Sequence, residues 1–200
     1  MYVDNVDSEK DNEMLILSDA DGVLLDWEFG FDQWMQQREF EKIRSDVYDI
    51  HLRYGIGKQL SKHLIKQFNE SAACGFLPPL RDSVKYVRKL YEEHGIRIRV
   101  ITSLSRDPAA VRLREENLKR HFGEAIESVI CLDCGADKDE ALAPYKNSEI
   151  YFIEDKPENA DLCDSLGLKG ILVEHEHNQD YKGKAVLVKY WKDIYKIVKQ

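Results

Sequence analysis

The fold of this chain is constrained most by a regular alternation of two sequence patterns. Short runs of consecutive apolar residues, such as MLILS at 14–18, are typical of strands buried on both faces of a sheet. Between these runs, apolar residues recur at the spacing of amphipathic helices. Strands that alternate with helices predict an α/β fold with a parallel sheet covered on both faces. We expect strands at 14–18, 96–102, 128–132, 149–153, 170–174 and 185–189, and helices at 78–95, 108–122, 137–145, 157–167 and 191–199.

One long stretch departs from this alternation directly after the first expected strand. Its apolar residues keep helical spacing, and Gly55 and Gly57 punctuate it. We therefore expect three parts in the chain. These are an N-terminal tail at 1–12, an α/β core at 13–27 and 78–200, and a helical insertion at 28–77.

Charge and hydropathy exclude some classes of partner. The chain has 200 residues and a formal net charge of −8, which disfavours duplex nucleic acid because its binding proteins carry a basic surface. An acidic protein still binds a small phosphorylated ligand where a metal ion and lysines supply positive charge. No apolar run approaches the roughly 20 residues that span a bilayer, and the acidic N-terminus lacks the features of a secretion signal. We expect no membrane partner and a cytoplasmic location, while the sequence leaves the oligomeric state open.

Polar side chains follow the expected strands at the points where these strands end. In open α/β sheets, ligands bind outside the carboxyl ends of the strands. Each group alone is also compatible with an ordinary turn or a helix cap, but their joint placement at one edge predicts a site. The candidate residues are Asp19 and Asp21, Thr102 and Ser103, Lys138, and Glu154 and Asp155.

These segments resemble the four motifs of the haloacid dehalogenase (HAD) superfamily. DADGVL at 19–24 resembles the first motif, VITS at 100–103 the second, a lysine before the fourth strand the third, and FIED at 152–155 the fourth. The resemblance implies a Rossmann-like core with a parallel sheet, in which the insertion at 28–77 is a small helical cap. It also implies a phosphatase, because HAD members that act on phosphoryl groups keep the second aspartate of the first motif.

The resemblance further implies roles for the acidic residues. Asp19 would be the nucleophile that forms an aspartyl-phosphate, and Asp21 would be the general acid and base. Mg²⁺ would be held by the Asp19 carboxylate, the backbone carbonyl of Asp21 and Asp155. Glu154 and Asn159 depart from the common family pattern, and their roles stay open.

The residues expected to bind the substrate phosphate come from the second and third motifs. By resemblance, Thr102, Ser103 and Lys138 would hold phosphate oxygens and offset the charge that develops on them. Lys146 is an alternative for the lysine because it lies closer to the fourth strand in the sequence.

The substrate class is indicated by a finer resemblance. EDKPEN at 154–159 is similar to the fourth motif of 5′(3′)-deoxyribonucleotidases, although the proline of their second motif is delayed here to Pro108. We therefore expect a small phosphomonoester as substrate, with a nucleoside or deoxynucleoside monophosphate as the leading candidate. The alternatives are a polynucleotide 3′-end phosphatase and a catalytically silent HAD-like binding protein.

Cysteine and histidine residues suggest a second, less favoured site. The four cysteines are expected to be reduced thiols in or near the core. CLDC at 131–134 has ligand-like spacing, but zinc would also need His175 and His177. We interpret HEHNQ at 175–179 as a solvated loop.

Overall fold

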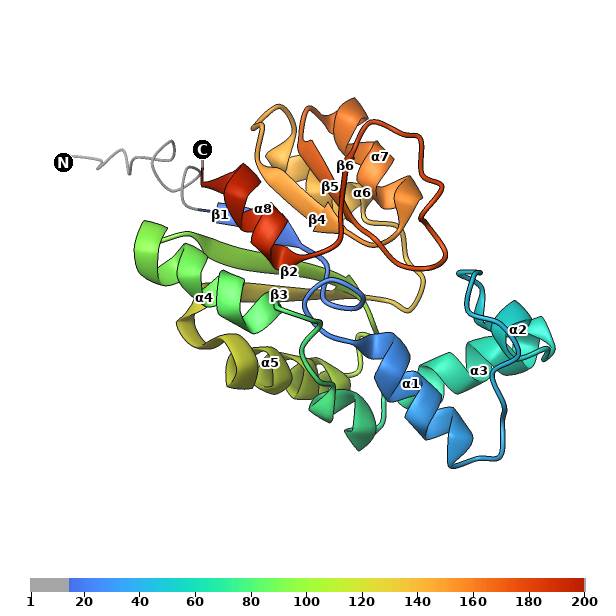
Figure 1. Cartoon of the computed structure of the whole chain (residues 1–200). Coiled ribbons are helices and arrows are strands. Elements are labelled where there is room, and N and C mark those ends of the chain that lie inside the picture. The colour runs from blue at the N-terminus through green and yellow to red at the C-terminus, as the bar shows by residue number, and fades with distance from the viewer. Residues whose placement is uncertain (1–14, 200) are drawn as a thin grey trace.

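The computed structural model of the chain describes residues 15–199, so the predicted tail at 1–12 lies outside the described residues. Six parallel strands form one sheet in the order β3-β2-β1-β4-β5-β6 (Figure 1). This confirms the predicted α/β fold with a Rossmann-like parallel sheet. The strands are β1 Leu15–Ser18, β2 Arg97–Ser103, β3 Ile126–Leu132, β4 Tyr151–Glu154, β5 Lys169–Val173 and β6 Val186–Val188.

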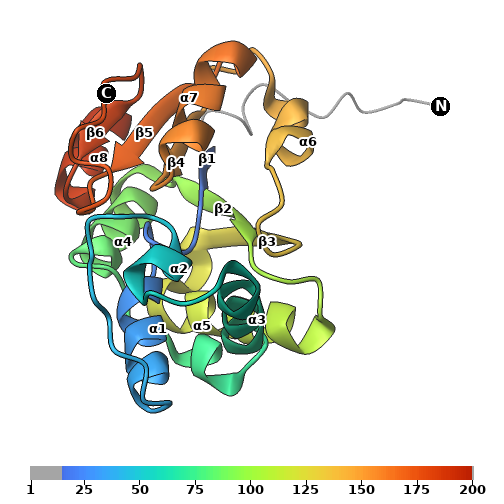
Figure 2. The same cartoon turned by 90° about the vertical axis from the view of Figure 1, so that its right-hand side faces the viewer.

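Helices cover both faces of the sheet (Figures 1 and 2). Ile16 and Leu17 of β1 point to opposite faces because side chains alternate along a strand; they belong to two separate apolar clusters. The Ile16 cluster includes side chains of α4 (Ser83–His94), α5 (Pro108–Phe122) and α8 (Trp191–Val198). The Leu17 cluster includes side chains of α6 (Asp139–Leu142) and α7 (Pro157–Leu166). Among residues 15–199, no helix is long and apolar enough to cross a membrane.

The stretch between β1 and α4 contains no strand, and its helices project to one side of the sheet (Figure 1). Phe31 is fully buried, stacks on Trp27 and meets Phe68 edge-on, so an aromatic cluster joins the first and third helices of this stretch. The elements are α1 Trp27–Gln36, α2 Ile50–Arg53, α3 Lys58–Asn69 and the 3-10 helix η1 Ala72–Phe76.

Two expected helix boundaries are wrong. Residues 37–49 are not helical; α1 ends here, and Glu39 adopts a φ of 64° that a helix does not accommodate. Helix α4 begins at Ser83 rather than at the two prolines. Pro79 instead forms a β-bridge with Leu25, which holds the start of this segment against the loop after β1.

The carboxyl ends of β1 and β4 lie side by side at the centre of the sheet. Ser18 is in register with Ile153, and the backbone N–H of Asp19 donates to the carbonyl of Ile153 at 2.8 Å. The strand order reverses between β1 and β4, which is where ligands bind in open α/β sheets. A ligand site is therefore expected at the residues that follow these two strands.

Candidate active site

The loop after β1 is a tight buried turn whose shape depends on a glycine. The backbone N–H groups of Leu24 and Leu25 both donate to the carbonyl of Ala20 at 2.9 Å. Gly22 has a φ of 72°, and a Cβ atom there would lie 2.4 Å from Oδ2 of Asp155. Because this conformation and this contact both require glycine, the turn can approach the end of β4 closely.

Asp19 lies at the end of β1 with its carboxylate turned into the protein. Its Oδ2 lies 2.8 Å from Nζ of Lys138, and its Oδ1 accepts the backbone N–H of Ala20 at 2.6 Å. Burial, together with the charges of Glu154 and Asp21, raises the pKa of Asp19 to about 7, whereas Lys138 acts against this shift. The ionised form of the Asp19 carboxylate is therefore stabilised by a neighbouring positive charge.

Lys138 supplies part of that charge from the N-terminus of α6. Only 1% of its surface is exposed, and its ammonium group lies between Asp19 and Glu154, 2.6 Å from Oε1 of the latter. Burial would lower the pKa of Lys138, but the two carboxylates raise it, so the side chain is charged. Of the two candidate lysines, the structure brings Lys138 to the site, whereas Lys146 is exposed.

Glu154 positions other groups because its two oxygens are already occupied by donors. Oε1 accepts from Lys138 and from Nδ2 of Asn159 at 2.8 Å, and Oε2 accepts the backbone N–H groups of Asp155 and Lys156 at 2.8 Å. Burial alone would raise the pKa of Glu154, but Lys138 and these hydrogen bonds lower it. Glu154 and Asn159 thus orient the lysine and the loop after β4.

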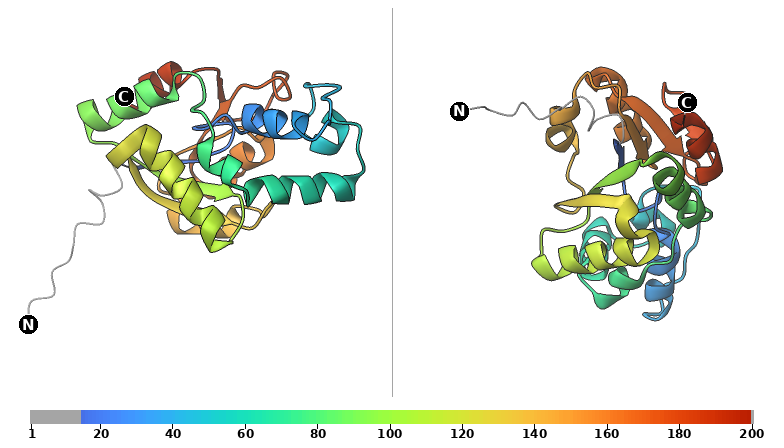
Figure 3. Two further views of the ribbon diagram at one scale, coloured as in Figure 1. Left: turned by 90° about the horizontal axis from the view of Figure 1, so that it is seen from below. Right: turned by 90° about the vertical axis from the view of Figure 1, so that its left-hand side faces the viewer.

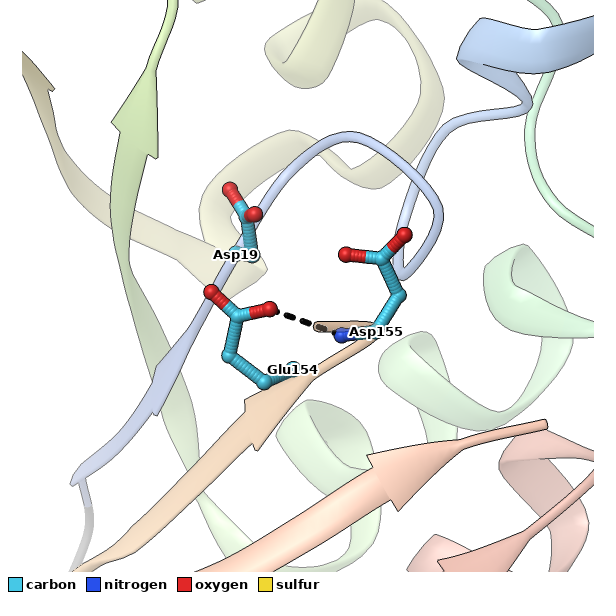
Figure 4. Close-up of side chains that lie close together, drawn as sticks. All are labelled: Asp19, Glu154 and Asp155. Atoms are coloured by element: carbon cyan, nitrogen blue, oxygen red, sulfur yellow. Dashed lines mark hydrogen bonds between the residues drawn. The ribbon is translucent and has the colours of Figure 1, made fainter. Parts of the chain in front are cut away.

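Asp155 presents the opposite case, a half-buried carboxylate that accepts no hydrogen bond from an N–H or O–H donor in the range 15–199. Burial and the charges of Glu154 and Asp19 raise its pKa well above the ordinary value. Carboxylate oxygens of these three residues lie within 4.8 Å of one another. Figure 4 shows the Asp155 carboxylate beneath the loop after β1, with Glu154 directed to its backbone. An oxygen-only set of this kind fits a hard divalent cation such as Mg²⁺, held by Asp19 and Asp155 rather than by the occupied Glu154.

Asp21 is held by Arg114, a residue that the sequence motifs do not indicate. Arg114 on α5 is fully buried, and its two terminal nitrogens lie 2.5 and 3.0 Å from the two carboxylate oxygens of Asp21. One signal was available in the sequence, because Arg114 occupies an apolar stripe of α5 with Ala110 and Leu118. A charged side chain at such a position indicates a buried partner.

Thr102 and Ser103, at the end of β2, lie at the edge of the same pocket. Thr102 is 1% exposed, and the Ser103 hydroxyl donates to the carbonyl of Ala136 at 2.8 Å. The structure therefore brings six of the seven candidate residues to the lining of one pocket of about 520 Å³, which lies between the sheet edge and the inserted helices, while Glu154 lies behind the lining. Tyr48 and Ile50 line the pocket from the insertion, and Trp27 lines it from the start of α1.

The interpretation of HEHNQ as a solvated loop is wrong. His175 and His177 are half-buried and line the pocket, and Nε2 of His175 lies 2.6 Å from the carbonyl of Gly22. Buried Asn178 donates to the carbonyls of Asp155 and Val173, both at 2.9 Å, which ties the segment to the end of β4. The sequence did not reveal these bonds because their partners are backbone atoms.

The cysteines do not complete a metal site in the described part of the chain. All four are free thiols, and Cys74 and Cys163 are buried, as expected. Burial raises the pKa of Cys163 to about 12 and that of Cys74 to about 11. Within residues 15–199, the one cluster suited to a metal is that of Asp19, Glu154 and Asp155, so the zinc alternative has no support.

The inserted helices contact the histidine segment over the pocket. The ring of Tyr48 meets that of His177 edge-on with centroids 5.1 Å apart, and Ser45 donates to Glu176. Half of the Tyr48 surface is exposed. The pKa of Tyr48, which lines the pocket, is nevertheless raised well above its usual range by burial and by the charge of Asp155.

The fold is shared with solved structures of hydrolases of the haloacid dehalogenase type. A predicted phosphatase from Clostridium acetobutylicum has a TM-score of 0.63 at 12% identity, covering 92% of this chain and 97% of that one. An L-2-haloacid dehalogenase has a TM-score of 0.59 at 14% identity, over 92% and 98%. A putative β-phosphoglucomutase from Thermotoga maritima has a TM-score of 0.52 at 16% identity, over 92% and 98%. At these identities the likeness concerns the fold.

The particular family follows from the sequence of nearly the whole chain. The chain belongs to the family of 5′ nucleotidase, deoxy (pyrimidine), cytosolic type C protein (NT5C), whose model matches residues 13–200. This confirms the predicted family resemblance, and it agrees with the predicted enzyme class, because 5′-nucleotidases are phosphoric monoester hydrolases. An uncharacterised 32.4 kDa protein in the Gp30–rIII intergenic region of Enterobacteria phage T4 is 26% identical over 155 residues, 73% of this chain and 55% of the phage protein. The chain thus spans about half the length of that curated relative.

Proposed function

We propose that this protein is a Mg²⁺-dependent phosphatase that hydrolyses a nucleoside or deoxynucleoside monophosphate in the cytoplasm. The proposal rests mainly on one arrangement of charged side chains. The buried carboxylate of Asp19 and the half-buried carboxylate of Asp155 lie together at the ends of adjacent strands, with the Lys138 ammonium beside Asp19. A phosphoryl group needs a nucleophile and nearby positive charge, and family membership supports the substrate class.

In this proposal the two aspartates of the first motif have different tasks. A carboxylate oxygen of Asp19 attacks the phosphorus atom and displaces the alcohol, which gives an aspartyl-phosphate. Asp21 gives a proton to the departing oxygen and later takes one from the water that hydrolyses the intermediate. Arg114 positions the Asp21 carboxylate through both of its oxygens.

The phosphate oxygens are held by groups from two further motifs. Lys138 lies beside Asp19, and Thr102 and Ser103 line the same pocket. These donors stabilise the negative charge that develops on the transferring group.

Mg²⁺ is proposed to bind Asp19, the backbone carbonyl of Asp21, and Asp155. The raised pKa of Asp155 and its lack of donors among the described residues support a cation there. When bound, Mg²⁺ polarises a phosphoryl oxygen and offsets the charge of the carboxylates.

We also propose that residues 28–77 are a helical cap that covers the substrate. Contacts from Tyr48 and Ser45 to the histidine segment support this role. A cap excludes water and bulky chains, which favours a small substrate over a polynucleotide 3′ end.

The test is a panel of phosphomonoesters that includes 5′- and 3′-nucleotides and a 3′-phosphorylated oligonucleotide. We expect release of phosphate from nucleoside monophosphates with Mg²⁺, a loss of at least about a thousandfold with Asp19→Asn, and no turnover in EDTA. Turnover of the oligonucleotide alone would favour the 3′-end phosphatase. Activity that survives EDTA or Asp19→Asn would overturn the mechanism, and ligand binding without any turnover would favour a silent binding protein.

A further inference from the structure

One wall of the pocket is formed by a single face of α3. At the core end of this face, Nδ2 of Asn69 donates to the carbonyl of Leu104 at 3.2 Å. The N-terminal end of the helix lies away from the sheet (Figure 3, left). The pocket-lining residues of α3 recur at helical spacing and are Lys58, Ser61, Lys62, Ile65 and Asn69.

The outer end of this wall is positively charged. Lys58 and Lys62 line the pocket, and neither forms an ion pair with another residue of the range 15–199. Gly57 caps the helix without a side-chain hydrogen bond, so the N–H groups of the first turn keep their partial positive charge.

Ser61 is the second and independent sign of a ligand at this end. The residue lines the pocket although it is only 5% exposed, and within the described part of the chain its hydroxyl makes no hydrogen bond. The backbone N–H of Ser61 donates to the carbonyl of Gly57 at 2.9 Å, as in any helix. Most buried hydroxyls are paired, so the hydroxyl of this pocket-lining residue is available to a bound molecule.

Acidic side chains that line the pocket form no ion pair with Lys58 or Lys62 within residues 15–199. Glu28 is engaged by Arg53 and Lys42. Asp49 is largely exposed and lies 4.0 Å from His51. The pocket thus has carboxylates at the sheet edge and a basic outer wall, with Ile65 of α3 between them.

We propose that the first turn of α3, with Lys58, Ser61 and Lys62, binds a second phosphate group on the alcohol portion of the substrate. The pocket would then accept a nucleoside monophosphate at Asp19 and bind more tightly a substrate that carries a further phosphate at the outer wall. This inference rests on the proposed function, because that function places the first phosphate. The rise along α3 from Ser61 to Asn69 is about 12 Å, so the outer wall lies about two helical turns from the core end of the helix.

Non-hydrolysable ligands test this subsite without any dependence on turnover. We would titrate the wild-type protein with Mg²⁺ and a series of linear alkane bisphosphonates of increasing length, each compared calorimetrically with the monophosphonate of equal length. We expect bisphosphonates above a minimum length to bind roughly tenfold tighter than the monophosphonates of equal length, and this preference should shrink as salt is raised.

Variants test whether the proposed residues cause the tighter binding of bisphosphonates. In K58Q/K62Q we expect the preference for bisphosphonates over monophosphonates to disappear. In S61A we expect this preference to fall to about threefold. The matched control is K85Q/K89Q, which removes two lysines from α4 outside the pocket and should keep it. No preference at any length, or an unchanged preference in K58Q/K62Q with an unchanged melting temperature, would overturn the subsite. Failure of the proposed function would appear separately, as an absence of phosphomonoester turnover alongside an intact preference.

Discussion

Only Ala20 separates Asp19 from Asp21 in the sequence, yet each carboxylate contacts a different buried cation. Asp19 contacts Lys138 at 2.8 Å, and Asp21 contacts Arg114 through both oxygens. A bidentate pair with arginine fixes the direction of a carboxylate more firmly than a contact with lysine. The pair is therefore asymmetric, and the side chain proposed to move protons is the one held in a fixed orientation.

Arg114→Met tests whether this orientation matters. We expect kcat to fall about tenfold to a hundredfold because Asp21 loses its position, and the free energy of unfolding to fall by about 2 kcal/mol because a mostly buried carboxylate is left without its partner. The exposed Arg112→Met on the same helix is the control. Arg114→Met added to Asp21→Asn should cost little further activity, whereas fully additive losses would show that Arg114 does not act through Asp21.

At the scale of elements, the site is closed by two segments that belong to neither the sheet nor its covering helices. The loop before α2 brings Tyr48 to the pocket, and the segment after β5 brings His175 and His177. Their contact joins the insertion to the core directly above the carboxylates. This contact is the place where closure of the proposed cap can be tested.

Tyr48→Ala removes the ring that meets His177. We expect KM to rise about five- to tenfold with a smaller change in kcat, because an edge-on aromatic contact contributes about 1 kcal/mol. Steady-state kinetics on the best substrate of the panel would measure this. Tyr190→Ala, at a residue of similar exposure outside the pocket, is the control, and an equal effect of both changes would argue against closure at Tyr48.

At the scale of the whole molecule, the sheet holds together residues that are far apart in the sequence. Strands β2 and β3 are linked by Arg99 and Glu127, whose side chains form two bonds of 2.8 and 2.9 Å. The hydrogen bonds from Arg99 are the main reason that the pKa of Glu127 falls to about 2. Because Thr102 and Ser103 end β2, this link supports one wall of the site.

Glu127→Gln tests the link through its dependence on pH. The pKa of Glu127 is lower in the folded state, so its stabilisation is complete above the unfolded value near 4.5 and is lost as pH falls towards 2. We expect the variant to be about 1 kcal/mol less stable at pH 7, with the difference shrinking below pH 5. Urea unfolding at several pH values measures this, and exposed Glu124→Gln is the control. A difference that does not change with pH would assign the effect to packing.

The sheet, the order of its helices and six site residues could be predicted from the sequence because each depends on local pattern or on residues at strand ends. Arg114 could not, since its partner lies 93 positions away and only the packed fold brings them together. The coil at 37–49 was missed because apolar spacing alone does not reveal a backbone reversal. The histidine segment looked solvated because polar residues that bond to backbone carbonyls resemble ordinary loop residues.

The central claim, that Asp19 carries the phosphoryl group, is tested most directly by trapping the intermediate. The protein would be quenched during turnover of its best substrate, treated with sodium borohydride and mapped by mass spectrometry. Borohydride reduces an aspartyl-phosphate to homoserine, so we expect homoserine at position 19 and none there in Asp19→Asn or without substrate. Steady turnover with no homoserine at position 19, or with homoserine at Asp155 instead, would contradict it.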